Sequence, residues 1–220
     1  MMHAPSGGVC RLVLVRHEHT ALAGTFCGQS DPPLSAVGKA ALQNVVRRMR
    51  PYPLQCVYSS DLRRTQQTAS AITQMLRLPL HLRSDLSEIA FGDWEGLDWQ
   101  RVVARNPEYA QRWLANYPEL HAPGGEPFAD FRQRVNNAIA TIADEVSNGC
   151  AAVVTHAGVI RAFLGEVLLS PEQTMQFSTP DYGSTIEVWR RNGTWMFPIA
   201  TLESAAVSED PANPHLRTKL

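Results

Sequence analysis

The chain has 220 residues, 44% of them hydrophobic, and a formal net charge of −1 at pH 7. This length fits one domain with room for an insertion, and the composition is that of a globular protein with a substantial core. The near-neutral charge excludes a global basic field for nucleic acid, and the apolar run at 12–15 is too short to span a membrane. Residues 1–9 lack a basic segment followed by a long apolar one, so we expect no signal peptide and a cytoplasmic location.

Strand-like and helix-like patterns alternate along the chain. Short continuous apolar runs predict strands buried on both faces, as in a parallel sheet. Apolar residues at intervals of three and four, bounded by capping residues and proline, predict helices. In the first half of the chain we predict a strand at 12–15, a helix capped by Ser35 and stopped by Pro51, a strand at 56–58, and a helix opened by Asp61 and ended by Pro79. In the second half we predict a helix at 128–146, a strand at 151–154 and a helix at 159–168. Two last strands, at 186–189 and 194–197, are predicted to form a hairpin around the Asn192–Gly193 turn.

This alternation predicts an α/β fold with a mostly parallel sheet and an antiparallel edge formed by the terminal hairpin. Residues 93–127 interrupt the alternation and are rich in Trp and Tyr, so we interpret them as a cap over one end of the sheet. The aromatic side chains of the cap either form a small core of their own or offer a platform for stacking a base. The predicted organisation is one domain at 1–203, with the cap inserted, and a flexible tail at 204–220.

The four cysteines, Cys10, Cys27, Cys56 and Cys150, form no CxxC pair. Three lie in or beside apolar, strand-like runs and are expected to be buried free thiols. Cys27 lies in a loop of turn-forming residues instead, where it could line a pocket.

Polar side chains follow the predicted strands directly. Arg16 and His17 follow the strand at 12–15, and His156 follows the strand at 151–154. Because ligands bind beyond the carboxyl ends of the strands in parallel α/β sheets, these side chains are expected to meet at one edge.

These residue types suit phosphoryl transfer. A neutral imidazole can attack phosphorus and carry the phosphoryl group, and the planar fork of arginine binds phosphate through paired hydrogen bonds. A carboxylic acid with a raised pKa can protonate the leaving alkoxide and then, as a base, activate water. Two histidines and a carboxylate could instead hold zinc, but nearby arginines would repel a cation, so we expect no metal and no cofactor.

Four motifs together resemble the histidine phosphatase superfamily, in its phosphoglycerate-mutase-like branch, over residues 11–200. They lie at residues 16–20, 59–69, 86–96 and 155–158. The resemblance implies a three-layer α/β/α sandwich and a phosphomonoesterase that works through phosphohistidine. It also implies site roles: His17 as nucleophile, Arg16, Arg64 and His156 as phosphate ligands, and Glu88 as proton donor, with Arg63 and Glu95 as the weaker alternatives for Arg64 and Glu88.

Within the family, the segments at 27–34 and 123–126 look closest to α-ribazole phosphatase-like members, which remove a 5′-phosphate during cobalamin biosynthesis. The implied ligand is a small phosphomonoester, with α-ribazole 5′-phosphate as a candidate. A phosphoglycerate-type mutase and a weakly catalytic member that binds a phospho-ligand or a partner are the alternatives, and monomer and homodimer both stay open. The implied substrate-binding residues are Thr20, Cys27, Gly28, Gln29 and Ala157.

Two positions depart from the family pattern. Glu18-His19 stands where the family usually has Gly-Glu, and a glutamate at position 18 would be strained if the backbone there required a positive φ. Ala23 stands near the place of an expected asparagine, so Thr20 or Thr25 is a candidate to replace a phosphate contact. His19 is either a solvated loop residue or part of the pocket.

Overall fold

The computed structural model describes residues 8–167 and 179–197, and its centre is a six-stranded sheet. The strands are β1 (Val9–Arg16), β2 (Cys56–Ser59), β3 (Leu80–Leu82), β4 (Cys150–Thr155), β5 (Thr185–Arg191) and β6 (Thr194–Met196). They lie in the order β3-β2-β4-β1-β5-β6. The first four run parallel, whereas β5 is antiparallel to β1 and β6 is antiparallel to β5. The predicted parallel sheet with an antiparallel edge is confirmed.

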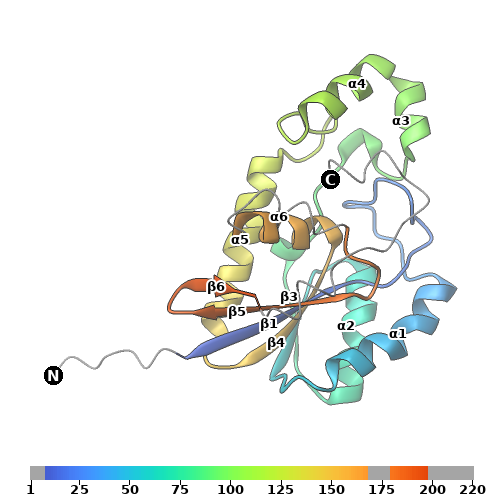
Figure 1. Cartoon of the computed structure of the whole chain (residues 1–220). Helices are drawn as coiled ribbons and strands as arrows, with labels where there is room; N and C mark the ends of the chain where they lie inside the picture. The colour runs from blue at the N-terminus through green and yellow to red at the C-terminus, as the bar shows by residue number, and fades with distance from the viewer. Residues whose placement is uncertain (1–7, 168–178, 198–220) are drawn as a thin grey trace.

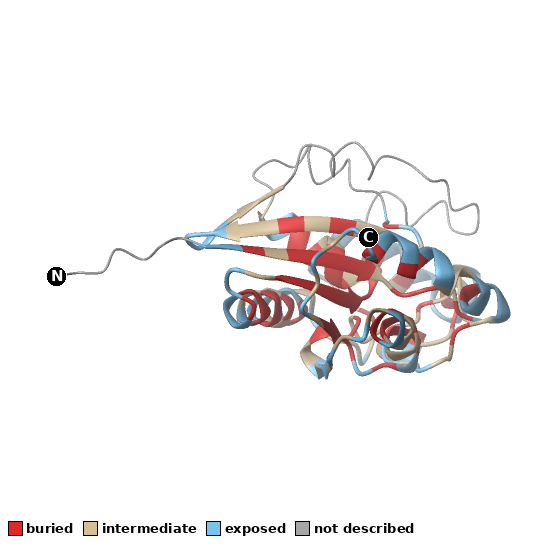
Figure 2. Ribbon diagram, turned by 90° about the horizontal axis from the view of Figure 1, so that it is seen from below, coloured by how far each residue is buried: buried red, intermediate tan, exposed pale blue. Residues whose placement is uncertain are grey.

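Helices cover both faces of this sheet and make the fold a three-layer α/β/α sandwich. Alternation along the central strand explains why residues 12–15 are all apolar: Leu12 and Leu14 join the core on one face, and Val13 and Val15 join the core on the other. Figure 2 shows the resulting concentration of buried residues along the sheet. One face is covered by α1 (Ala36–Met49) and α2 (Arg63–Leu76), and the other by α5 (Phe128–Glu145) and α6 (Ala157–Val167).

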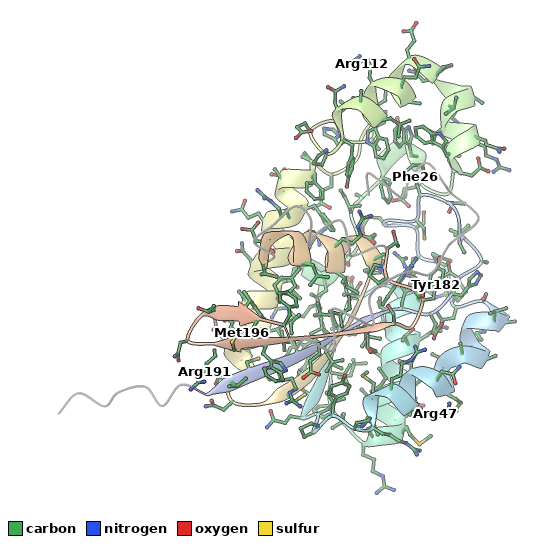
Figure 3. The ribbon with its side chains drawn as sticks, in the orientation of Figure 1. Phe26, Arg47, Arg112, Tyr182, Arg191 and Met196 are labelled. Atoms are coloured by element: carbon green, nitrogen blue, oxygen red, sulfur yellow. The ribbon has the colours of Figure 1, made fainter. Side chains whose placement is uncertain are left out.

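The inserted segment forms a cap with its own apolar core beyond the end of the sheet (Figure 1). Its elements are the 3₁₀ turn η2 (Gly92–Trp94) and the helices α3 (Trp99–Arg105) and α4 (Pro107–Asn116). Trp113 is only 1% exposed. Phe26 joins this core from the loop after β1, beneath the cap helices in Figure 3. Backbone hydrogen bonds of 2.8 Å from Phe26 N to Leu97 O and from Gly96 N to Phe26 O fix it there. The aromatic side chains of the cap therefore serve mainly as a core.

The predicted helix boundaries hold in part. Ser35 caps α1 as predicted, because its Oγ accepts a hydrogen bond of 3.1 Å from Gly38 N. Asp61 does not cap α2, which begins at Arg63; its carboxylate instead accepts a hydrogen bond from Ser87 Oγ. Helix α6 begins at Ala157, two residues before the predicted start at 159.

Several short elements carry no clear periodic pattern and were not predicted: β3, the cap helices, and the 3₁₀ turn η1 (Ser84–Leu86). The division into a domain at 1–203 and a tail at 204–220 stays a prediction, and both the tail and position 168 lie outside the described residues. In the described part of the chain, no helix is long and apolar enough to cross a membrane.

Candidate active site

The register of the parallel strands brings both histidines of the site together. Strands β1 and β4 are aligned so that Arg16 lies opposite Thr155. The next residue continues this pairing, because His17 N donates to Thr155 O at 3.0 Å. The rings of His17 and His156 then lie edge to face with their centroids 5.2 Å apart. The predicted convergence at the carboxyl edge of the sheet is confirmed for this pair.

His17 is held as a neutral imidazole with a defined free nitrogen. The side chain is 7% exposed, and its Nδ1 lies 2.7 Å from Glu18 O. A carbonyl only accepts, so Nδ1 carries the proton and Nε2 carries the lone pair. Burial lowers the pKa of His17 well below its usual range, and the positive charges of Arg16 and Arg64 lower it further. The ring is therefore suited to nucleophilic attack through Nε2.

Arg64 holds the loop in front of the histidines. It is 1% exposed, whereas Arg63 points into solvent, which supports Arg64 over its neighbour as the site arginine. Its Nη atoms donate to the carbonyls of Ser30 at 2.7 Å, Gly28 at 2.8 Å and Cys27 at 3.3 Å. Its buried Nε has no hydrogen-bond partner among the described residues. A buried N–H without a partner on a guanidinium group is suited to an anionic oxygen.

Arg16 lies against Tyr182, a residue that the sequence analysis missed. The guanidinium carbon lies 3.8 Å from the centroid of the Tyr182 ring, and Nη1 donates to Pro180 O at 2.5 Å. The same ring contacts His17 and His19, with centroid distances of 5.7 and 5.2 Å. Tyr182 thus forms one wall of the site, and His19 belongs to that wall rather than to open solvent.

Glu88 is a buried carboxyl group at the N-terminal end of α6. It is 8% exposed, and burial raises its pKa above the usual range. Hydrogen bonds to its carboxylate from Gly158 N (2.9 Å) and Ile89 N (3.0 Å), together with the arginine charges, oppose this rise without cancelling it. The approach requires glycine at position 158, because a Cβ there would come within 2.2 Å of Glu88 Oε1.

Glu95, the alternative carboxylate, clamps the loop instead. It accepts hydrogen bonds from the backbone N–H groups of Gly28 (3.1 Å), Gln29 (2.8 Å), Ser30 (3.0 Å) and Phe91 (3.0 Å), and from Ser30 Oγ (2.5 Å). Burial alone would raise the pKa of Glu95, but these hydrogen bonds outweigh it and leave the pKa lowered. An ionised acceptor with this many donors is a structural group.

The expected strain at Glu18 is absent. Among the described residues, the non-glycine positions with positive φ are Arg77, Asn148 and Asn192, so Glu18 is not one of them. Its buried side chain fits because residue 183 is glycine: a Cβ there would lie 2.1 Å from Glu18 Oε1. The glutamate at position 18, which departs from the family pattern, is thus accommodated by the glycine at position 183.

The candidates to replace a contact at Ala23 are engaged within their own turn. Thr20 Oγ1 accepts a hydrogen bond from Leu22 N at 3.3 Å, and Thr25 Oγ1 donates to Leu22 O at 2.7 Å. Thr20 is also 2% exposed and forms a β-bridge with Leu34. Within residues 8–167 and 179–197, no contact compensates for Ala23.

The other predicted substrate-binding residues border the site. Cys27, Gly28 and Gln29 form the loop held between Arg64 and Glu95, and Gln29 Nε2 donates to Glu88 O at 2.7 Å. Ala157 is the first residue of α6, directly after His156. The cysteines are free thiols; Cys10 and Cys150 are buried, and Cys27 Sγ lies 3.8 Å from Ser30 O.

Arg134 is a second residue that the sequence analysis missed. From α5 its Nη1 donates to Asp85 O (3.0 Å) and Ser87 O (2.9 Å), and its Nη2 pairs with Glu126 at 2.8 Å. It thereby ties the segment before Glu88 to the edge of the cap. In the sequence, a helical arginine that donates to carbonyls of a distant segment looks the same as a helical arginine in solvent. No pattern in the sequence therefore singled out Arg134. Among the described residues no group of three His, Cys, Asp or Glu side chains is placed to hold a metal ion.

Comparisons with known proteins agree with this geometry. The model of the histidine phosphatase superfamily (branch 1) matches residues 12–198. The chain is 28% identical to the adenosylcobalamin/α-ribazole phosphatase of Escherichia coli over 92% of this chain and 100% of that protein. It is 34% identical to a metal-independent phosphoserine phosphatase of Arabidopsis thaliana over 70% of this chain and 67% of that protein. The α-ribazole phosphatase structure from Shigella flexneri superposes with a TM-score of 0.79 at 27% identity, over 91% of this chain and 99% of that one.

We predict that Gly158→Ala displaces the Glu88 carboxylate, because the new methyl group would lie only 2.2 Å from Glu88 Oε1. A displacement of about 1 Å at a reacting group costs about 10²-fold in rate, so kcat should fall by this order. Steady-state kinetics on a phosphomonoester measures the change, and far-ultraviolet circular dichroism checks that the fold is kept.

A double-mutant cycle provides the control. Glu88→Asp shortens the side chain and relieves the contact, so Gly158→Ala should cost much less in the Glu88→Asp background than in the wild type. Equal costs in the two backgrounds would show that Gly158 does not act through Glu88.

Glu95→Gln is expected to loosen the loop at 28–30, since one amide oxygen cannot replace two carboxylate oxygens that serve three backbone donors there. The free energy of unfolding should drop by about 1–3 kcal/mol, measured by urea denaturation. Glu119→Gln, on an exposed residue of the cap segment, is the control and should change little. Because the pKa of Glu95 is lowered by folding, its contribution is present at neutral pH and is lost as the pH falls through the folded-state pKa. A stability difference between variant and wild type that persists undiminished at low pH would contradict this assignment.

Proposed function

The chain belongs to branch 1 of the histidine phosphatase superfamily and is a phosphomonoester hydrolase, and we propose that it acts through a phosphohistidine on His17. The observation that carries the proposal is the geometry of this ring. Its Nδ1–H is fixed on Glu18 O, and Nε2 is directed away from that carbonyl. It lies beside the half-buried Arg16 and the buried Arg64 and His156, whose side chains can bind an anion.

The reaction follows from the placement of these groups. In the proposed first step, His17 Nε2 attacks phosphorus while the arginines bind the phosphate oxygens, which carry the charge of the transition state. Glu88, with its pKa raised by burial, gives its proton to the leaving alkoxide. In the second step, the Glu88 carboxylate takes a proton from water as the water attacks the phosphohistidine. Inorganic phosphate leaves, and both side chains return to their initial states.

A small pocket, with room for about one water molecule, lies beneath the cap beside the site. It begins at Ile89, directly after Glu88, and its walls include Phe91, Tyr117 and Phe128. We propose α-ribazole 5′-phosphate as the substrate to test first, because two similar proteins carry α-ribazole phosphatase in their names. Phosphoserine is the second candidate, from the name of the Arabidopsis relative.

The test is phosphate release from a panel: α-ribazole 5′-phosphate, phosphoserine, 3-phosphoglycerate and p-nitrophenyl phosphate, with a chelator and without a bisphosphate primer. We expect hydrolysis under these conditions, with the highest kcat/KM for the ribazole ester. Activity that depends on a bisphosphate primer would instead indicate a mutase. A thermal shift with ligand but no phosphate release would indicate a binding protein.

His17→Ala should lower kcat by at least about 10³-fold, because it removes the nucleophile. After a rapid quench in alkaline denaturant, which preserves the acid-labile P–N bond, mass spectrometry should find the phosphoryl group on the peptide that contains His17. His81→Ala, which changes an exposed histidine, should leave both results unchanged. Retention of most turnover in His17→Ala would overturn the phosphohistidine mechanism.

Glu88→Gln should slow esters of aliphatic alcohols far more than p-nitrophenyl phosphate, because p-nitrophenolate leaves readily without a proton. The wild-type kcat/KM for an aliphatic ester should fall as the pH rises through the raised pKa of Glu88, and this limb of the profile should be absent in the variant. Equal losses for both types of ester would exclude Glu88 as the proton donor.

A further inference from the structure

A chain of side-chain hydrogen bonds leads from His156 to the protein surface. His156 Nε2 lies 3.0 Å from Ser60 Oγ, which lies 3.2 Å from Ser87 Oγ. Ser87 Oγ in turn lies 2.7 Å from Asp61 Oδ1. The histidine is fully buried and both serines are buried, whereas Asp61 is exposed.

The direction of every hydrogen bond in this chain follows from the Asp61 end. A carboxylate only accepts, so the single hydroxyl proton of Ser87 goes to Asp61. Ser87 can therefore only accept from Ser60, which uses the single hydroxyl proton of Ser60. The remaining contact must be a hydrogen bond that His156 Nε2–H donates to Ser60 Oγ. The N–H of Leu62 also donates to Ser60 Oγ, at 3.3 Å, which completes the two acceptor positions of this hydroxyl.

This direction decides which nitrogen of His156 carries the proton. With the proton fixed on Nε2, the neutral ring has a lone pair on Nδ1. Nδ1 is buried and has no hydrogen-bond partner among the described residues. A lone pair facing a phosphate oxygen is repulsive, so His156 can donate to phosphate only after Nδ1 gains a proton.

We propose that Ser60, Ser87 and Asp61 form a positioning relay that holds the proton of neutral His156 on Nε2, so that phosphate binding is coupled to protonation of Nδ1. The proton comes from solvent or from the phosphate monoanion, and the product is an imidazolium that donates Nε2–H to Ser60 and Nδ1–H to phosphate. The carboxylate of Asp61 balances part of the new positive charge through the polarised hydroxyls. The relay stands on the hydrogen bonds alone, whereas the coupling of phosphate binding to protonation of Nδ1 rests on the proposed phosphate-binding role of His156.

The charged and titratable groups around His156 make this coupling necessary. Burial lowers the pKa of His156 well below its usual range, and positive charges act in the same direction. They come from three elements: Arg64 on α2, Arg16 at the end of β1, and Arg134 on α5. His17 is neutral in the free site, and it would lower the pKa of His156 further if it gained a proton. Without an anion the ring is neutral. A phosphate dianion reverses the local field and makes the imidazolium favourable.

The test is ¹⁵N nuclear magnetic resonance of histidine ring nitrogens in the full chain, with His156 assigned by the signal that is lost in His156→Gln. In the free protein we expect Nε2 protonated and Nδ1 bare, and on titration with inorganic phosphate we expect both nitrogens to be protonated. A free protein with the proton on Nδ1 would overturn the relay. If phosphate binds but Nδ1 stays bare, the coupling is wrong. If phosphate does not bind while Nε2 is protonated, the relay stands and the proposed function fails.

Ser87→Ala removes the acceptor of the Ser60 hydroxyl, which can then turn and donate to His156 Nε2. We expect the Nδ1–H tautomer to appear in this variant and kcat/KM to fall about tenfold, because a neutral donor replaces a charged one. Ser59→Ala is the matched control: Ser59 Oγ donates to Ser60 O at 2.8 Å and takes no part in the chain, so neither the tautomer nor kcat/KM should change. An unchanged tautomer in Ser87→Ala would also overturn the proposal.

Discussion

The buried guanidinium of Arg64 is the constraint on which the rest of the site depends. Its Nη atoms are satisfied by three backbone carbonyls rather than by a carboxylate, so its positive charge is not neutralised by an ion pair among the described residues. A charge held this way in a poorly solvated place acts strongly on its neighbours. It helps to keep both histidine rings neutral, and it leaves the site with an excess positive potential that a phosphate dianion can satisfy.

Two glutamates of the same loop region behave in opposite ways because their surroundings differ. Glu88 accepts two backbone hydrogen bonds in a buried position, and burial dominates its pKa. Glu95 is less buried and accepts five hydrogen bonds, which dominate instead. One carboxyl group is thereby kept ready to carry a proton, and the other is kept ionised to hold the loop that Arg64 also binds. Pairs of titratable groups separated in this way are typical of acid–base assignments in enzymes.

The sequence was sufficient for every strand of the sheet except β3, for the four main helices and for the convergence of His17 and His156, because these depend on local apolar patterns and on strand ends. It was not sufficient for contacts that join distant segments. Tyr182 lies more than 160 positions after Arg16 yet packs against its guanidinium, and no local pattern marks this contact. The fit of Glu18 likewise depends on Gly183, a residue that the motif does not include. A departure from a family motif can therefore be judged only together with the residue that packs against it.

The two histidines of the site illustrate why identical side chains take different roles. The Nδ1 of His17 is bound to the carbonyl of the next residue, a purely local contact, and Nε2 is left with a lone pair that can attack. The Nε2 of His156 is bound to a hydroxyl brought from another strand, and Nδ1 faces the site. The partner of each ring decides which nitrogen is available and in which protonation state. The proposed nucleophile and the proposed phosphate donor are thus distinguished by backbone register and hydroxyl direction, because both rings are buried in the same positive field.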